Sequence, residues 1–287
     1  TTLNSGSADL TLNEASSTFG TLVLTGANVA VTDAGAADLG VSTVSGTFGI
    51  TSGGAITDSG TLAVTGDATF TNTSGSNDAI TLDDASNAFA GTVTFATDSG
   101  SAVTIVDTTA LDLKALSAAS LSVTAGGAVT DSGTLAITGA TTLNSGSADL
   151  TLDQSASTFG TLAITGANVA VTENAAMDLG ASTISGTASF NSTSNAITDS
   201  GTLAITGATT LNSGSADITL NEAASTFGTL AITGTNVAVT ENATMDLGAS
   251  TISGTASFNS SNNAITDSGT LAITGVTTLN SGSADLT

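Results

Sequence analysis

The segment Gly160-Thr-Leu-Ala-Ile-Thr-Gly166 decides the fold, because it returns unchanged at 201–207, 228–234 and 269–275. A related segment, Gly-Ala-Ser-Thr-Ile-Ser-Gly, begins at Gly180. In both, large apolar residues alternate with Thr, Ala or Ser, which is the two-residue period of a β-strand. No 3.6-residue helical period is present, and the frequent Gly and β-branched residues disfavour helix. The sequence therefore predicts short strands that recur about every 20 residues.

A larger repeat contains this finer one. The phrase Thr-Thr-Leu-Asn-Ser-Gly-Ser-Ala-Asp begins at Thr1, Thr141, Thr209 and Thr277, and the last two intervals are equal. The 68-residue units 141–208 and 209–276 differ at nine positions. We expect one continuous solenoid fragment of a longer protein, with large repeats at about 1–68, 69–140, 141–208, 209–276 and, in part, 277–287. Each large repeat is expected to hold three coils of about 20–27 residues.

Two columns appear when the coils are aligned on their starting Gly. The fourth residue after each start is large and apolar, and the sixth is usually Gly. The apolar column includes Ile137, Ile164, Ile184, Ile205, Ile232, Ile252 and Ile273, and the Gly column includes Gly166, Gly186, Gly207, Gly234 and Gly254. If equivalent residues lie above one another, stacked coils bury the apolar column that no single coil could bury. The expected fold is an all-β, right-handed parallel β-solenoid (β-helix).

Within one coil, the pattern predicts strands at 162–165, 169–172 and 177–179, arranged as three faces. Asn, Gly and Glu mark the corners between them. The alternative architecture is a row of β-sandwiches, one for each large repeat. The finer period of about 20 residues disfavours it.

The composition excludes several functions. The net charge is −23, Lys114 is the single basic residue, and His, Cys, Trp, Tyr and Pro are absent. Nucleic acids and anionic membranes need clusters of Lys and Arg, so neither is an expected partner. No apolar run is long enough for a transmembrane helix. Without His or Cys the common nucleophilic triads cannot form. We expect no enzyme, no catalytic residue and no organic cofactor.

One acidic pattern suggests a calcium site. Asp recurs two residues before the coil start in adjacent coils, as the pairs Asp38 and Asp58, Asp178 and Asp199, and Asp246 and Asp267. In-register stacking would bring each pair to about 5 Å, where bound Ca²⁺ would relieve the repulsion. The alternative is that each Asp caps backbone N–H groups at a corner. We favour this second interpretation.

We interpret the Thr and Phe side chains as structural residues. Rows of outward Thr, for example Thr161 with Thr165, could bind ice or a crystalline polysaccharide. Unequal coil lengths disfavour a regular lattice, so ordinary strand-surface Thr is the preferred interpretation. Phe19, Phe159 and Phe227 each precede a coil start. We expect Phe side chains to fill corners of the core, because they are the largest apolar groups of the chain.

The tripled Gly-x-Leu-x-Ile-x-Gly coils resemble the shaft repeats of filamentous-haemagglutinin-like adhesins and other giant bacterial exoproteins, over essentially the whole chain. The resemblance implies a right-handed β-helix, export to the cell surface or beyond, and a role in adhesion or surface structure. The expected function is a non-enzymatic structural or adhesive shaft that associates with itself into fibres or holds a receptor-binding region. A ligand-binding solenoid for glycan, ice or calcium is the alternative.

Overall fold

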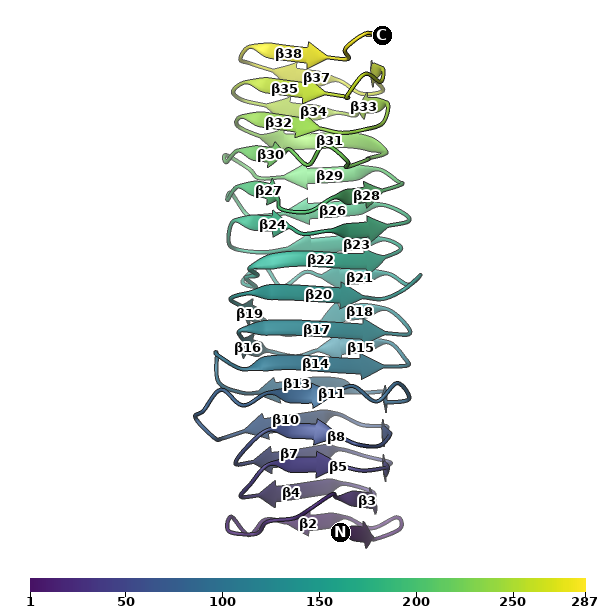
Figure 1. The fold of residues 1–287 in the computed structure, drawn as a ribbon, viewed down its shortest axis with the longest axis vertical. Coiled ribbons are helices and arrows are strands. Elements are labelled where there is room, and N and C mark those ends of the chain that lie inside the picture. Colours follow the sequence, from purple (N-terminus) through teal and green to yellow (C-terminus); the bar gives the residue numbers. More distant parts are fainter. The chain divides into compact units, whose positions relative to one another are not determined.

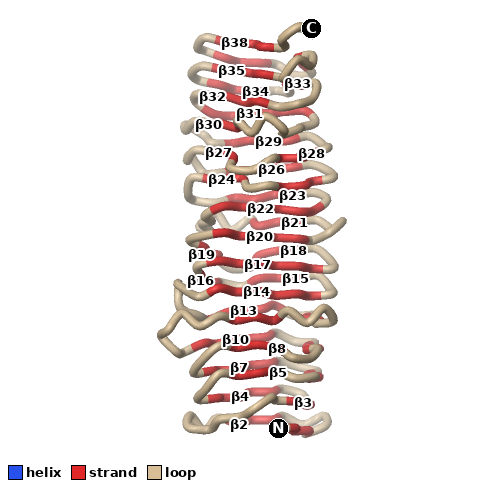
Figure 2. Tube along the Cα trace, in the orientation of Figure 1, coloured by secondary structure: helices blue, strands red, loops and turns tan.

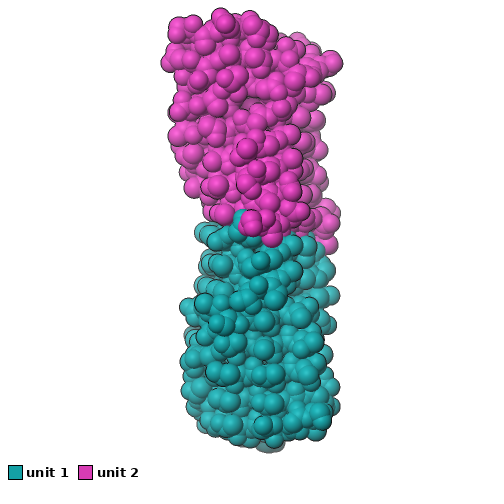
Figure 3. Space-filling model, turned by 90° about the vertical axis from the view of Figure 1, so that its right-hand side faces the viewer, with its two compact units in different colours: residues 1–146 teal, residues 147–287 magenta.

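The computed structural model describes residues 1–287 and consists of strands β1 to β38 joined by corners and loops, without a helix (Figures 1 and 2). No segment therefore forms a helix that could cross a membrane. The strands are parallel and stack as a β-solenoid of about 14 coils. The chain divides into two compact units, which Figure 3 colours separately: Thr1–Gly146 (unit 1) and Ser147–Thr287 (unit 2).

Unit 2 has two faces, each a stack of parallel strands. The first face contains β21 (Leu150–Leu152), β23 (Val169–Thr172), β26 (Ala188–Asn191), β29 (Thr209–Asn212), β31 (Thr229–Gly234), β33 (Met245–Leu247) with β34 (Ser250–Ile252), and β36 (Ile265–Asp267) with β37 (Leu271–Ile273). The second face contains β22 (Thr161–Gly166), β24 (Met177–Leu179) with β25 (Ser182–Ile184), β27 (Ile197–Asp199) with β28 (Leu203–Ile205), β30 (Ile218–Leu220), β32 (Val237–Thr240), β35 (Ala256–Asn259) and β38 (Thr277–Asn280).

Unit 1 is built in the same way. Its first face contains β2 (Leu10–Leu12), β4 (Val29–Asp33), β7 (Phe48–Ser52), β10 (Ala68–Asn72), β13 (Thr92–Ala96), β15 (Leu111–Leu113) with β16 (Leu116–Ala118), and β18 (Val129–Asp131) with β19 (Leu135–Ile137). Its second face contains β1 (Thr2–Asn4), β3 (Val23–Gly26), β5 (Ala37–Leu39) with β6 (Ser42–Val44), β8 (Ile56–Asp58) with β9 (Leu62–Val64), β11 (Ile80–Leu82) with β12 (Ala88–Phe89), β14 (Ala102–Asp107), β17 (Ser120–Ala125) and β20 (Ala140–Asn144).

A face is formed in one of two ways. On a single-strand side, one strand crosses the face. On a split side, two short strands lie end to end with a kink between them, as at Gly180 between β24 and β25. β22 pairs with both of these strands, through Leu162 with Leu179 and Gly166 with Ile184. The partner offset grows by one residue between these two points, which is a β-bulge at the kink.

The 68-residue repeat is three and a half coils long, and this corrects the three coils expected from sequence. Within unit 2, in-register pairs lead from Thr209 to Leu230, Leu247 and Asp267, so three coils have closed at Asp267. The repeat-equivalent of Thr209 is Thr277, which lies further along the chain, in β38 on the second face. Successive repeats therefore exchange the faces that are split and single.

The half coil explains why some coils appeared long in the sequence. Gly228 and Gly201 begin the same heptapeptide, so their sequences align. An added Cβ at Gly228, however, would lie 2.4 Å from the carbonyl oxygen of Gly207. Gly228 therefore stacks on Gly207. In the same way, a Cβ at Gly91 would meet Gly66 at 2.4 Å.

The coil that strand pairing defines is shorter than the long coils inferred from the sequence, although its length still varies. Among the shortest coils is the one that returns from Thr229 to Asp246. Among the longest is the one that returns from Ala68 to Val93 in the divergent repeat. Loops at the corners absorb this difference, because the paired strands keep a regular parallel register.

The expected strands of the coil that begins at Gly160 are present as β22, β23 and β24, but they do not form three faces. β24 already stacks on β22, so one coil has closed after two faces. The sequence pattern located the strands correctly, because alternation is a local property. The number of faces depends on which strands pair, which alternation does not determine.

The apolar column is buried, but it is several short ladders rather than one. Ile137, Ile164, Ile184, Ile205, Ile232 and Ile252 are at most 2% exposed, and Ile273 is half-buried. Ile184 pairs with Ile205, and Ile252 with Ile273. Ile164 instead donates its N–H to the Ser182 hydroxyl at 3.0 Å. Ile232 stacks on Leu211, because the half-coil shift moves it to the other face.

The Gly column is also broken into short stacks. The Gly207 N–H donates to the Gly186 carbonyl at 2.8 Å, and a Cβ at Gly207 would lie 2.4 Å from that oxygen. Close backbone approach therefore requires Gly at this corner. Gly166 and Gly234 are placed differently, since they end long strands and pair with Ile184 and Ile252. Gly254 begins another corner stack, with Gly275 above it.

Phe side chains fill the interior, with one exception. All are at most 5% exposed except Phe19, which is half-buried. In unit 1, Phe70 lies 5.6–5.9 Å, between ring centroids, from Phe48, Phe89 and Phe95. In unit 2 the equivalent partners are aliphatic, since Phe190 pairs with Leu211.

Candidate functional site

A buried carboxyl group accompanies each change from a split to a single-strand side. The backbone N–H of a Phe donates to it across the boundary between two coils. The four pairs are Phe19 with Asp33, Phe89 with Asp107, Phe159 with Glu173, and Phe227 with Glu241. All four acids are at most 1% exposed. We call each pair an acid joint.

The position of the acid joint follows from the backbone hydrogen bonds. In the coil that holds β30, residues 225–227 stand where the second short strand of the split side would be, and Ala204 pairs with Thr226. The next coil crosses this face as the single strand β32, so no strand covers Phe227. A buried N–H without an acceptor is costly. Glu241, which follows β32, supplies the missing acceptor through Oε2 at 2.9 Å.

Asp and Glu satisfy the joint to different degrees. Asp33 accepts the N–H groups of Phe19 at 3.2 Å and Gly35 at 2.9 Å. Asp107 accepts those of Phe89 at 3.3 Å and Thr109 at 2.9 Å, and also the Thr109 hydroxyl. The longer Glu side chain extends to the Phe N–H and does not turn back to its own corner.

Both Glu joints and the Asp107 joint leave one oxygen without a hydrogen-bond partner, which is Oδ2 in Asp107. Glu173 and Glu241 each accept one N–H through Oε2, and Oε1 of each is buried without a hydrogen-bond partner. Burial raises the pKa of both carboxyl groups to about 8, although the Phe N–H acts in the opposite direction. Burial also raises the pKa of Asp107, against the bonds from Thr109 and Phe89. Both Glu joints are therefore largely protonated at neutral pH.

The six Asp residues of the calcium hypothesis do not form stacked pairs. Asp38 pairs with Thr57, and Asp58 pairs with Leu39, so the two Asp are one residue out of register. The same offset separates Asp178 from Asp199 and Asp246 from Asp267. A one-residue offset turns neighbouring side chains to opposite faces of a strand. Nowhere in residues 1–287 are three or more His, Cys, Asp or Glu arranged to hold a metal ion.

These Asp side chains bind groups of neighbouring coils instead. Asp178 Oδ2 accepts the hydroxyls of Thr161 and Ser200, both at 2.8 Å. Asp38 and Asp246 each accept a Thr and a Ser hydroxyl in the same way. Asp58 and Asp199 instead accept two consecutive N–H groups of the loop above, at 2.8 and 3.2 Å. Asp58 and Asp199 thus cap backbone N–H groups as the second interpretation expects, whereas Asp38, Asp178 and Asp246 bind side-chain hydroxyls.

A second polar ladder was not anticipated from sequence. Asp149 Oδ1 accepts the N–H and side-chain amide of Asn168, at 3.1 and 2.9 Å, and Asn168 Oδ1 accepts the N–H and hydroxyl of Thr187, both at 3.1 Å. The pattern repeats from Asp9 and from Asp217. At Asp67, the N–H of Thr92 and then its hydroxyl hold the pKa below its ordinary value. The equal spacing from Asp to Asn to Thr was the available signal.

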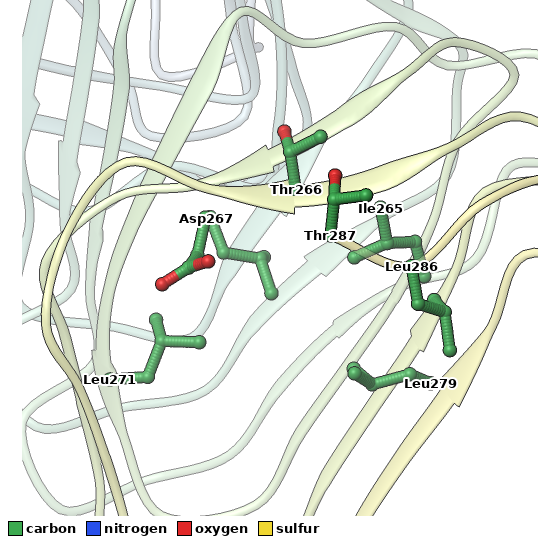
Figure 4. Close-up of a pocket in the computed structure, with 8 residues that line it drawn as sticks. Ile265, Thr266, Asp267, Leu271, Leu279, Leu286 and Thr287 are labelled. Carbon is green, nitrogen blue, oxygen red and sulfur yellow. The ribbon is translucent and has the colours of Figure 1, made fainter.

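A hollow of about 330 Å³ lies at the last coil of unit 2, and Figure 4 shows residues that line it. Leu271, Leu279, Leu286 and Ile265 point into it, with Asp267 at its side. These apolar groups belong to the interior column, on which no further coil lies in this structure. The hollow is therefore solenoid interior rather than a pocket with converging polar groups.

The chain belongs to a family described as Repeats of unknown function (DUF5649), whose model matches residues 26–96, 100–165, 166–233 and 234–287. The spacing between the starts of these segments is close to that of the large repeat. No curated protein and no solved structure matches the chain. The repeated unit is thus a family feature.

The acid joints could have been found from sequence. In three of the four, the separation along the chain from Phe to acid is identical, as from Phe159 to Glu173. The fourth, from Phe89 to Asp107, has a longer separation and lies in the divergent repeat. A search for columns at the coil period overlooks this signal, because the joint occurs once in three and a half coils.

Proposed function

We propose that this chain is a non-enzymatic structural shaft of a large bacterial protein that is secreted or displayed on the cell surface. The observation that carries the proposal is that each 68-residue repeat adds three and a half stacked coils. Such a repeat can be added without altering its neighbours, because each coil contacts only the coils beside it. The chain is thus suited to setting distance.

The outer surface supports a spacer role. Its Asp side chains bind to neighbouring corners, and its outward strand residues are mainly Thr, Ser and Ala. The net charge of −23 opposes aggregation between chains. The resemblance of the repeats to the shafts of filamentous-haemagglutinin-like adhesins supports an extracellular setting, with adhesion or fibre formation as the role of the parent protein.

The test compares the particle length of the full chain with that of a variant lacking 209–276. This deletion joins Ala208 to Thr277 and preserves the phrase Thr-Thr-Leu-Asn at the junction. Small-angle scattering should show a shortening of about 17 Å, since each coil adds about 4.8 Å. An unchanged maximum dimension would contradict the shaft. The matched control is a full-length chain with Val276→Ala, which places the same Ala before Thr277.

Ligand binding is a separate outcome. A spacer predicts no retention of the full chain on a glycan array and no change of melting temperature with calcium or a chelator. Reproducible binding in either experiment would favour the ligand-binding alternative over the bare spacer.

A further inference from the structure

The two Glu joints of unit 2 are closed by a single hydrogen bond each. Glu241 is fully buried. One of its carboxyl oxygens accepts the Phe227 N–H, and the other has no hydrogen-bond partner. Glu173 has the same geometry one large repeat earlier in the chain. A protonated carboxyl group fits this environment better than a carboxylate, because its carbonyl oxygen accepts the N–H and no charge is buried, although its O–H group has no acceptor. An ionised carboxylate would need donors that the joint does not contain.

No cation faces either group. The strands that flank β32 are β30 and β35, and neither carries a charged residue. The loop that leads to Phe227 contributes Glu222, and β33 contributes Asp246. Around Glu173, β21 and β26 are uncharged, and Asp153 and Asp178 are the corresponding acids. The chain's single basic side chain, Lys114, belongs to unit 1.

We propose that Glu173 and Glu241 are pH-operated latches, which close the joints of unit 2 when protonated and open them locally when ionised. An ionised Glu241 withdraws toward water and releases the Phe227 N–H, which then has no acceptor. The adjoining bond from Asn242 N–H to the Ser225 carbonyl, 2.7 Å long, fixes the same corner and is expected to loosen with it. The device changes local order within a shaft and does not depend on what the shaft carries.

The direction of the pH effect follows from the shift. Each Glu has a folded-state pKa of about 8, above the ordinary value of 4.5. The folded state therefore binds the additional proton between these two pH values. The stability contribution is complete below pH 4.5, declines as the pH rises toward 8, and changes no further above 8. The latch closes in acid and opens in mild alkali.

The test measures amide hydrogen exchange at Phe159 and Phe227 in the full chain between pH 5 and 10. Rates are divided by those of a Glu173→Gln and Glu241→Gln double variant, whose amides accept the same N–H but do not ionise. The ratio should rise about tenfold for each pH unit between 6 and 8 and then level off. The Phe190 amide, within β26, serves as the internal control. A ratio that stays constant overturns the proposal.

A second measurement needs no variant. Carbon-13 shifts of the Glu carboxyl groups report their titration directly in the unmodified chain. Two carboxyl groups that titrate near pH 8, alongside Phe159 and Phe227 amides that lose protection, support the latch. Titration of all Glu near pH 4.5, or titration near 8 with full amide protection retained, overturns it.

Discussion

Asp33 in unit 1 and Glu241 in unit 2 occupy the same place in the coil, yet the first accepts two backbone N–H groups and the second accepts one. The shorter side chain reaches the Phe N–H at 3.2 Å while its other oxygen remains beside its own corner. The longer one reaches 2.9 Å and leaves that corner. Between these two joints, one methylene exchanges a carboxyl group whose two oxygens both accept an N–H for one with an orphan oxygen, although the Asp107 joint also has an orphan Oδ2.

The comparison shows that the half coil imposes a requirement and that the repeats meet it differently. A strand stack that changes from split to single must leave one N–H uncovered. Unit 1 covers it with Asp33 and Asp107, and unit 2 with Glu173 and Glu241. Beside the joint, Val64 pairs with Phe89 in unit 1, and Ile205 lies next to the Ala204–Thr226 bridge below Phe227 in unit 2.

The largest effect is expected from a charge beside the joint. Ile205→Asp and Val64→Asp would each bury a carboxylate among apolar side chains, at positions that are 2% and 4% exposed. We expect a loss of about 4 kcal/mol or more in the free energy of unfolding of the affected unit. Chemical denaturation followed by circular dichroism measures it. Ile205→Val is the control, with a loss of about 1 kcal/mol.

If Ile205→Asp and wild type have the same denaturation midpoint, the side chain of Ile205 does not point into the solenoid. If only Val64→Asp is destabilising, the two joints are not equivalent. The acid joints of the two units could then no longer be compared as equivalent sites.

The next effect separates the units by pH. The contribution of each Glu joint to the free energy of unfolding should fall by at most about 1.4 kcal/mol for each pH unit between 4.5 and 8, because the pKa of each Glu is raised to about 8. Unit 1 contains one acid with a raised pKa, Asp107. Unit 2 should therefore lose more stability than unit 1 from pH 5 to pH 8. Hydrogen exchange measured at increasing denaturant concentrations gives a separate unfolding curve for each unit, and these curves provide the measurement.

The exchange of Glu for Asp sharpens this test. Glu173→Asp together with Glu241→Asp should let each carboxylate turn back to its own corner, as Asp33 does toward Gly35. The pH dependence of unit 2 should then become shallower. An unchanged slope would mean that another group is responsible for it.

Sequence reasoning was successful where local periodicity determines structure. The strands β22, β23 and β24 lie where alternation placed them, and Ile164 and Ile184 are buried as expected. It failed where the answer depends on pairing between coils. Gly228 resembles Gly201 in its surrounding sequence, yet it stacks on Gly207. Identical heptapeptides therefore occupy different faces, which no comparison of their letters can reveal.

The candidate site was missed for a related reason. Asp178 and Asp199 were conspicuous because acids at the coil period form a column in an alignment, but their register differs by one residue. Glu173 and Glu241 were overlooked because they recur once in each large repeat rather than once in each coil. Their burial and orphan oxygens depend on the half-coil shift, which emerges only after the coils are stacked.

A smaller effect is expected at the Gly stacks. A Cβ added at Gly207 would lie 2.4 Å from the backbone oxygen of Gly186, and one at Gly66 would lie 2.7 Å from that of Gly46. Gly207→Ala should therefore cost more than Gly66→Ala, within about 1–3 kcal/mol for overpacking. Gly20→Ala is the control, because nothing lies within 4 Å of the added atom. Thermal melts would contradict the stack if all three variants behaved alike.

The smallest effect concerns loop corners. Both units place Gly in the left-handed region, as Gly75 in unit 1 and Gly214 in unit 2, with φ of 66° and 57°. Unit 2 alone places a β-branched residue there, Thr193 with φ of 50°, followed by Ser194 with φ of 72°. A β-branched side chain is strained in this conformation, by about 1–2 kcal/mol. Thr193→Gly should therefore stabilise unit 2, by less than that amount because Gly also gains freedom in the unfolded chain.

The matched control for Thr193→Gly is Thr198→Gly in the adjacent strand β27, where φ is not positive. That substitution removes a strand-forming side chain without relieving strain, so it should destabilise by about 1 kcal/mol. Opposite signs for the two variants in thermal melts are the expected result. Destabilisation by both would mean that the Thr193 corner stores no strain, so that a β-branched residue at a left-handed corner of unit 2 would carry no energetic cost relative to Gly.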